Sequence, residues 1–122
     1  MKYVYNKLVR DKIPENINAT DGRTANFRVL SNEEYLQELD KKLFEEAHEF
    51  VEEHSVEELA DIMEVIFSIM STINISVEDV EKVREAKKAK KGGFEDKLYL
   101  IDVEQDFVDE REENELKKQW RR

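Results

Sequence analysis

Cysteine is absent from the 122-residue chain, which excludes a disulfide framework and a thiolate metal site. Glycine occurs three times and proline once, and this scarcity favours helices over a turn-rich β architecture. The longest apolar stretch, residues 65–70, contains Ser68 and is far shorter than the roughly 20 residues that span a bilayer. Residues 1–14 are highly charged and lack the apolar core of a signal peptide. We therefore expect a cytoplasmic protein that is not inserted in a membrane.

Acidic residues outnumber basic ones by 30 to 20, so the formal net charge is −10. This field repels a nucleic-acid backbone, and we expect no long DNA or RNA partner. A single nucleotide that arrives with Mg²⁺ remains compatible with the charge. The length predicts a single domain, residues 1–122, with one core.

Three serines mark predicted helix starts. Each is followed three positions later by an acidic residue and then by apolar residues at helical spacing, a pattern typical of a capping box. Gly92 and Gly93 end the third helix. The serines are Ser31, Ser55 and Ser76, and the predicted helices cover residues 32–53, 56–73 and 77–91.

The predicted organisation has three parts. Residues 1–30 are an extended or irregular N-terminal arm, in which Pro14 starts a short helical turn. Residues 31–100 are the helical core. Residues 101–122 are a charged extension, either a further helix that docks Phe107, Leu116 and Trp120 or a loose tail.

Four carboxylates form two i,i+3 pairs, one on each of the first two predicted helices, and each pair shares a helical face. Oxygen ligands of this kind suit Mg²⁺, or Mn²⁺ in its place, and a phosphate that accompanies the metal. Acidic residues are abundant, however, so such pairs also arise by chance on solvated faces. Glu58 has a second explanation, because it can be the reciprocal partner of the Ser55 helix cap. The predicted ligands are Glu46, Glu49, Glu58 and Asp61.

A helical wheel places these carboxylates at the edges of apolar faces, where unpaired like charges are partly desolvated unless a cation compensates them. Glu45 falls on the far side of its helix, which suits an indirect role. The apolar arc of the second helix covers more than half of its circumference, too much for one neighbour, so we expect a homodimer that completes a helical bundle. This arc comprises Leu59, Ile62, Met63, Ile66, Phe67, Ile69, Met70 and Ile73.

Cations gather in two places. One group ends the third predicted helix, where it either binds phosphate or meets the helix dipole and aids solubility. The other group of cations alternates with apolar residues between Asn6 and Pro14. It is either an arm that binds phosphate or simply a charged terminus. His48 and His54 lack a second histidine at ligand spacing and give no support to Ser/His/Asp catalysis. The first group comprises Arg84, Lys87, Lys88, Lys90 and Lys91.

Four segments together carry a family resemblance. They are Tyr-Asn-Lys-Leu-Val-Arg-Asp-Lys-Ile-Pro at 5–14, Lys-Leu-Phe-Glu-Glu-Ala-His-Glu at 42–49, Glu-Glu-Leu-Ala-Asp-Ile-Met-Glu-Val at 57–65 and Gly-Gly-Phe at 92–94. The chain resembles the all-α nucleoside triphosphate pyrophosphohydrolases of the MazG-like superfamily, in the phosphoribosyl-ATP pyrophosphohydrolase-like branch. The match covers about residues 1–100. Eight residues separate Glu49 from Glu58, which is shorter than in many members and leaves the substrate open.

The resemblance implies an all-α bundle of at least two chains and hydrolysis between the α and β phosphates to a nucleoside monophosphate and pyrophosphate. It implies Mg²⁺ on Glu46, Glu49, Glu58 and Asp61, with Glu45 or Glu64 orienting water or holding a second metal. It also implies phosphate contacts, and those residues are Lys7, Arg10, Lys88 and Lys91.

Three functions compete. The leading one is a nucleotide pyrophosphohydrolase that cleans the nucleotide pool. The second is hydrolysis of phosphoribosyl-ATP in histidine biosynthesis, although nothing in the chain selects a ribosyl phosphate. The third is an acidic helical interaction protein such as a DNA mimic, for which the net charge is suitable but the gathering of carboxylates beside an apolar seam is not.

Overall fold

A computed structural model describes residues 1–106 and 109–119 of the chain. Five helices and no strand lie in this part of the chain, so the prediction of an all-α fold is confirmed. The residues group into two compact units, Met1–Lys87 and Lys88–Arg122. The prediction of one domain with three parts stays a prediction.

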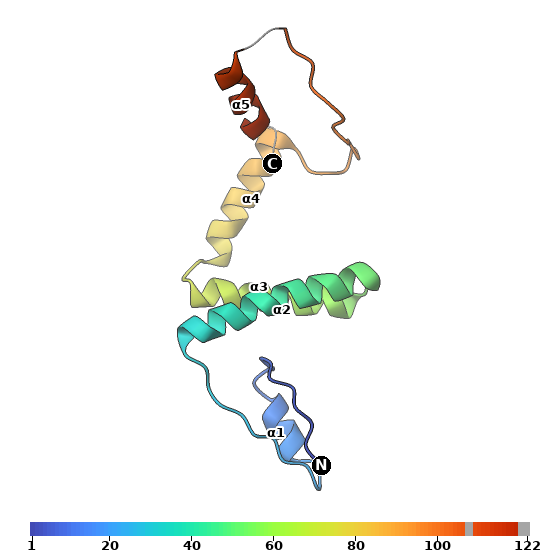
Figure 1. The fold of residues 1–122 in the computed structure, drawn as a ribbon, viewed down its shortest axis with the longest axis vertical. Coiled ribbons are helices and arrows are strands. Elements are labelled where there is room, and N and C mark those ends of the chain that lie inside the picture. The colour runs from blue at the N-terminus through green and yellow to red at the C-terminus, as the bar shows by residue number, and fades with distance from the viewer. Residues whose placement is uncertain (107–108, 120–122) are drawn as a thin grey trace. The chain divides into compact units, whose positions relative to one another are not determined.

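The centre of the first unit is a helical hairpin of α2 (Asn32–Glu52) and α3 (Val56–Thr72), which lie side by side in Figure 1. Only three residues connect them, so the helices run antiparallel as the sequence predicts. The start of each helix is set by a serine whose Oγ accepts a backbone N–H three residues later, from Glu34 in α2 and from Glu58 in α3, both at 3.2 Å.

The buried apolar residues in the described part of the chain belong to these two helices. Leu39 of α2 is 3% exposed, and Val65 and Met70 of α3 are nearly as well covered. The apolar arc predicted from the sequence does not include Val65. The structure corrects this prediction, because Val65 is buried. It lies on the side of α3 that packs against α2, whereas much of the predicted arc lies on the opposite side. The exposed members of that arc are Leu59, Met63, Ile66, Phe67 and Ile73.

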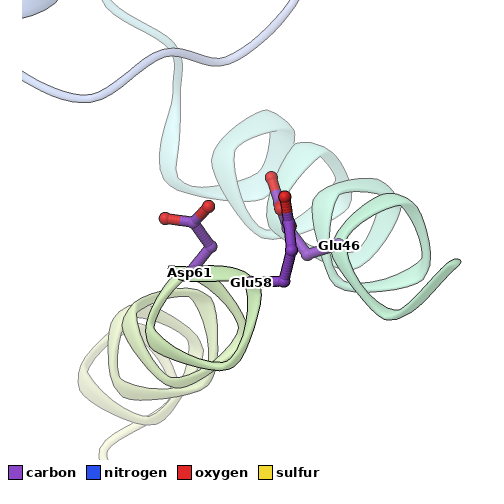
Figure 2. A group of neighbouring side chains, drawn as sticks. All are labelled: Glu46, Glu58 and Asp61. Atoms are coloured by element: carbon purple, nitrogen blue, oxygen red, sulfur yellow. The ribbon is translucent and has the colours of Figure 1, made fainter. Parts of the chain in front are cut away.

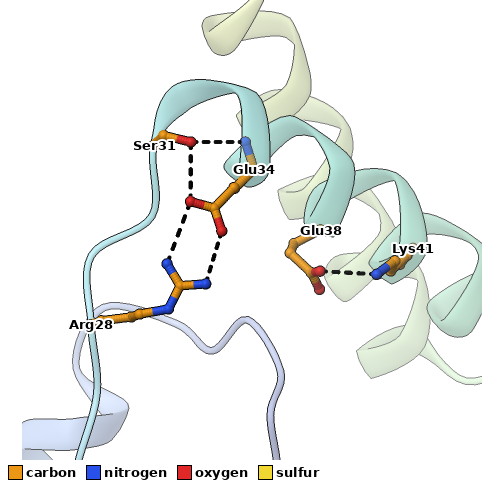
Figure 3. Close-up of polar contacts among 5 residues, drawn as sticks. All are labelled: Arg28, Ser31, Glu34, Glu38 and Lys41. Atoms are coloured by element: carbon orange, nitrogen blue, oxygen red, sulfur yellow. Dashed lines mark hydrogen bonds and ion pairs between the residues drawn. The ribbon is translucent and has the colours of Figure 1, made fainter.

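A short helix, α1 (Ile13–Asn18), precedes the hairpin in a segment predicted to be extended or irregular. Pro14 lies in its first turn, as expected for a residue without a backbone N–H, and α1 contains no buried residue. The arm then reaches α2 through Arg28, which pairs with Glu34 at 2.8 Å beside the Ser31 cap (Figure 3).

α4 (Val77–Lys91) has the predicted bounds and crosses from the first unit into the second. Its serine cap is Ser76, whose Oγ accepts from Asp79 N at 3.1 Å. Gly92 follows at φ 83°, a conformation that glycine adopts at little cost, and its N–H donates to Lys88 O at 2.8 Å.

The predicted C-terminal helix exists as α5 (Glu110–Gln119) and includes Leu116. Phe107 and Trp120, its other predicted docking residues, lie outside the described residues. In the part of the chain that is described, no single helix has both the length and the apolar character needed to cross a bilayer, although α3 and α4 meet that test jointly as a bent pair.

Candidate metal centre

The α2–α3 hairpin brings acidic residues from two helices to one place. Glu46 lies six residues before the end of the long helix α2, whereas Glu58 lies in the first turn of α3. The Ser55 cap binds the Glu58 backbone N–H, which sets where this turn begins. Asp61 follows three residues later on the same face of α3.

The carboxylates of Glu46, Glu58 and Asp61 each offer an oxygen, and these three oxygens lie within 4.8 Å of one another. Figure 2 shows the three side chains extending to the same side of the helix pair. Three hard oxygen donors at this separation can ligate one divalent cation, with water or phosphate oxygens completing its coordination.

Two of these carboxylates are incompletely satisfied. Glu46 is only 8% exposed, and its Oε2 atom has no hydrogen-bond partner among the described residues. The Oε2 atom of Glu58 is in the same condition. Buried polar atoms normally have partners, so these two unpartnered carboxylate oxygens are available as ligands for a cation.

The pKa of Glu46 is raised to about 7, first because burial disfavours its charged form. The adjoining Glu58 carboxyl and the charges of Glu49 and Asp61 raise it further, and Lys42 opposes them. The pKa of Glu58 is also raised, again mainly by burial. A divalent cation would lower both pKa values, because it favours the charged form of each carboxylate.

Two cations already contact the cluster. Lys42 Nζ lies 3.9 Å from Glu46 Oε1, one helical turn earlier on α2. Arg10 of the N-terminal arm donates from Nη2 to Asp61 Oδ1 at 2.8 Å. Sequence reasoning did not single out Lys42, although its position four residues before Glu46 would have indicated it.

The other predicted carboxylates lie differently. Glu49 is half-buried, and its charge raises the pKa of both Glu46 and Glu58, but it is not among the oxygens that lie within 4.8 Å of one another. Glu45 is exposed on α2, in agreement with its predicted place on the far side of the helix. Glu64 is exposed on α3.

Of the predicted phosphate-binding residues, the structure brings Arg10 to the carboxylates. Lys7 is exposed in the arm. Lys88 and Lys91 belong to the second unit, where Lys88 Nζ lies 3.9 Å from Glu95 Oε1 and Lys91 is exposed at the end of α4.

The residues present fit a hard divalent cation, because the donors are all carboxylate oxygens and two of them are buried without partners. Comparisons of the chain with protein-family models, with curated proteins and with solved structures find no match.

Proposed function

We propose that the chain is a Mg²⁺-dependent nucleotide pyrophosphohydrolase of the MazG-like kind, which cleaves a nucleoside triphosphate or a related nucleotide to a monophosphate and pyrophosphate. The observation that carries the proposal is the pair of buried, unpartnered oxygens within the three-carboxylate cluster. The four motifs that resemble this superfamily supply the reaction class. Nucleotide-pool cleaning in the cytoplasm is the role that we attach to it.

The chain would hold the metal through Glu46, Glu58 and Asp61, and the half-buried Glu49 would add negative charge beside them. When bound, Mg²⁺ or Mn²⁺ neutralises phosphate charge and lowers the pKa of a nearby water. Carboxylates on two packed helices keep their spacing fixed, which reduces the reorganisation needed to reach the transition state.

The cations have the second task, which is to bind the polyphosphate. Arg10 is next to the site and has the planar fork that binds phosphate oxygens in pairs. Lys7, Lys88 and Lys91 are the further phosphate contacts that the resemblance implies. Glu45 is exposed, so its proposed part is to orient water at the edge of the site rather than to ligate the metal.

Assembly is part of the proposal, because α3 exposes a second apolar face that its neighbour in the chain does not cover. Residues at spacings of four and three along α3 form this outer face, and such a stripe packs well against an identical helix. We propose a homodimer or a higher homo-oligomer built on it. The outer face comprises Leu59, Met63, Ile66, Phe67 and Ile73.

The test is release of pyrophosphate from a panel of common and modified nucleoside triphosphates and phosphoribosyl-ATP, with Mg²⁺ and with EDTA. Glu58→Gln should lower the rate by at least roughly 100-fold, since it removes a ligand rather than a supporting contact. Glu57→Gln is the matched control, because Glu57 is exposed and its substitution removes the same charge one residue away.

Equal amounts of pyrophosphate and monophosphate, formed only with metal, would support the proposal. Circular dichroism of both variants would establish that each retains its helices. Lack of pyrophosphate from every substrate, or equal losses in Glu57→Gln and Glu58→Gln, would refute it. Phosphoribosyl-ATP as the single substrate would move the enzyme to the second function.

A further inference from the structure

An ion pair connects the N-terminal arm to the carboxylate cluster. Arg10 Nη2 donates to Asp61 Oδ1 at 2.8 Å, and the two residues lie 51 positions apart. Each of the other ion pairs found in residues 1–106 and 109–119 joins residues at most seven positions apart. The arm therefore has a long-range electrostatic attachment, and it ends on a candidate metal ligand.

Apolar packing of the arm is sparse. Tyr3, Val4 and Tyr5 are exposed before Arg10, and Phe27 and Val29 are exposed after α1. α1 itself buries no residue. Leu8 and Val9, which adjoin Arg10, are half-buried. The arm therefore combines limited apolar contact with the ion pair, and its position depends in part on the charge of Asp61.

Arg10 and a metal ion would require the same carboxylate. A divalent cation on Asp61 places two like charges beside one another and removes much of the attraction that holds the guanidinium. Arg10 is 58% exposed in this pair, so it can leave for water without crossing a packed region. Exposed ion pairs are weak, and a chelated divalent cation is the stronger competitor.

We propose that Arg10 is the counter-cation of Asp61 in the metal-free protein and that binding of a divalent cation at Glu46, Glu58 and Asp61 releases Arg10, and with it the arm. This inference rests on the metal site of the proposed function but not on its hydrolysis. By linkage, docking of the arm weakens metal binding by the same factor by which the metal weakens docking. The released guanidinium is then available for a substrate phosphate.

The experiment is calorimetric titration with Mg²⁺ alone, at low ionic strength, of the full chain and two variants. Arg10→Gln should bind Mg²⁺ roughly three- to tenfold more tightly, because it removes the competitor and its charge. Arg28→Gln is the matched control. It removes the same charge and an ion pair of the same 2.8 Å length from the arm, but its partner Glu34 is not a metal ligand, so affinity should be unchanged (Figure 3).

Hydrogen exchange supplies a second measurement. Ile13 N–H donates to Arg10 O and Thr20 N–H donates to Ile17 O, both at 3.0 Å, so the amides of this segment report whether α1 persists. Mg²⁺ should accelerate exchange over residues 13–20 in the unaltered chain. It should have no such effect in Arg10→Gln, where the arm is already released.

Unchanged or weaker Mg²⁺ binding by Arg10→Gln, or slower exchange of residues 13–20 with Mg²⁺, would overturn this inference while leaving the proposed function intact. Tighter binding by Arg10→Gln without pyrophosphate release from any nucleotide would refute the function alone. Failure of all three proteins to bind Mg²⁺ would overturn both.

Discussion

Both faces of α3 carry apolar residues, but their environments differ. The inner face packs on α2, covers Val65 and carries Glu58 and Asp61, whereas the outer face exposes Met63 and Ile66 with no covering element in the described part of the chain. The inner face thus combines a core with a cluster of charges, and the outer face offers area alone. Hydrophobicity therefore shows where a helix is able to pack, and the position of the charges shows where chemistry is able to occur.

The largest change should come from the inner seam. Leu39→Ala removes a side chain that is 3% exposed and leaves a cavity between α2 and α3, so the free energy of unfolding should fall by about 2–5 kcal/mol. Urea denaturation measures it. Val51→Ala on the same helix is the control, since Val51 is exposed and its loss should change stability by less than about 0.5 kcal/mol. Equal effects of the two changes would mean that α2 does not pack as described.

Proton binding should also affect the inner face. The pKa of Glu46 is about 7 in the fold and 4.5 as a free side chain, so the folded state binds its proton more tightly. Its stabilising contribution is therefore complete below about pH 4.5 and is lost as the pH rises through 7, by up to about 3 kcal/mol in EDTA.

Thermal melts over this pH range in EDTA measure the effect of Glu46. Glu46→Gln should flatten the fall in melting temperature between pH 4.5 and 7, whereas Glu45→Gln, on the exposed side, should keep it. Mg²⁺ should raise the melting temperature at pH 7, because it binds the folded state. The same fall in Glu46→Gln as in the unaltered chain would assign the pH dependence to other groups.

The outer face should matter for assembly instead. Met63→Glu places a charge in the proposed dimer contact and should weaken dimerisation at least tenfold, which corresponds to about 1.4 kcal/mol. Sedimentation over a range of concentrations measures this change. Ser71→Glu adds the same charge on the polar side of α3 and should leave dimerisation unchanged. A chain that is monomeric at every concentration before any substitution would contradict the assembly.

Loss of a helix cap should have the smallest effect. Ser55→Ala and Ser76→Ala each remove an oxygen that accepts a backbone N–H and should each lower stability by about 1 kcal/mol. Ser55 precedes Glu58, so its loss should also weaken Mg²⁺ binding, whereas loss of Ser76 should not. Chemical denaturation and metal titration of the two variants measure these effects. Equal metal affinities of the two variants would show that the Ser55 cap does not support the metal site.

The sequence predicted the helices well, because their ends depend on local signals. Ser31, Ser55, Ser76 and Gly92 act within a few residues of themselves, and the observed bounds differ from the predicted ones by at most one residue. The inner face of α3 was harder to identify. Both of its faces are apolar, so helical periodicity alone does not tell which side meets α2, and Val65 was missed.

The site was predictable to the extent that helical spacing determines it. Spacing placed Glu58 and Asp61 on one face of α3 and predicted that Glu49 lies level with Asp61 across the hairpin, whereas the three clustered oxygens come from Glu46, Glu58 and Asp61, and Glu49 acts on Glu58 from beside them. The pairing of Arg10 with Asp61 joins residues 51 positions apart, and no local pattern indicates such a contact.

Binding of Mn²⁺, followed by the loss of the free-ion electron paramagnetic resonance signal, tests the central claim most directly. The account predicts saturable binding at the carboxylate cluster in the unaltered chain, competition by Mg²⁺, loss of binding in Glu58→Gln and retention in Glu57→Gln. Absence of saturable binding, or equal binding by the two variants, would show that the buried oxygens of Glu46 and Glu58 do not form a metal site.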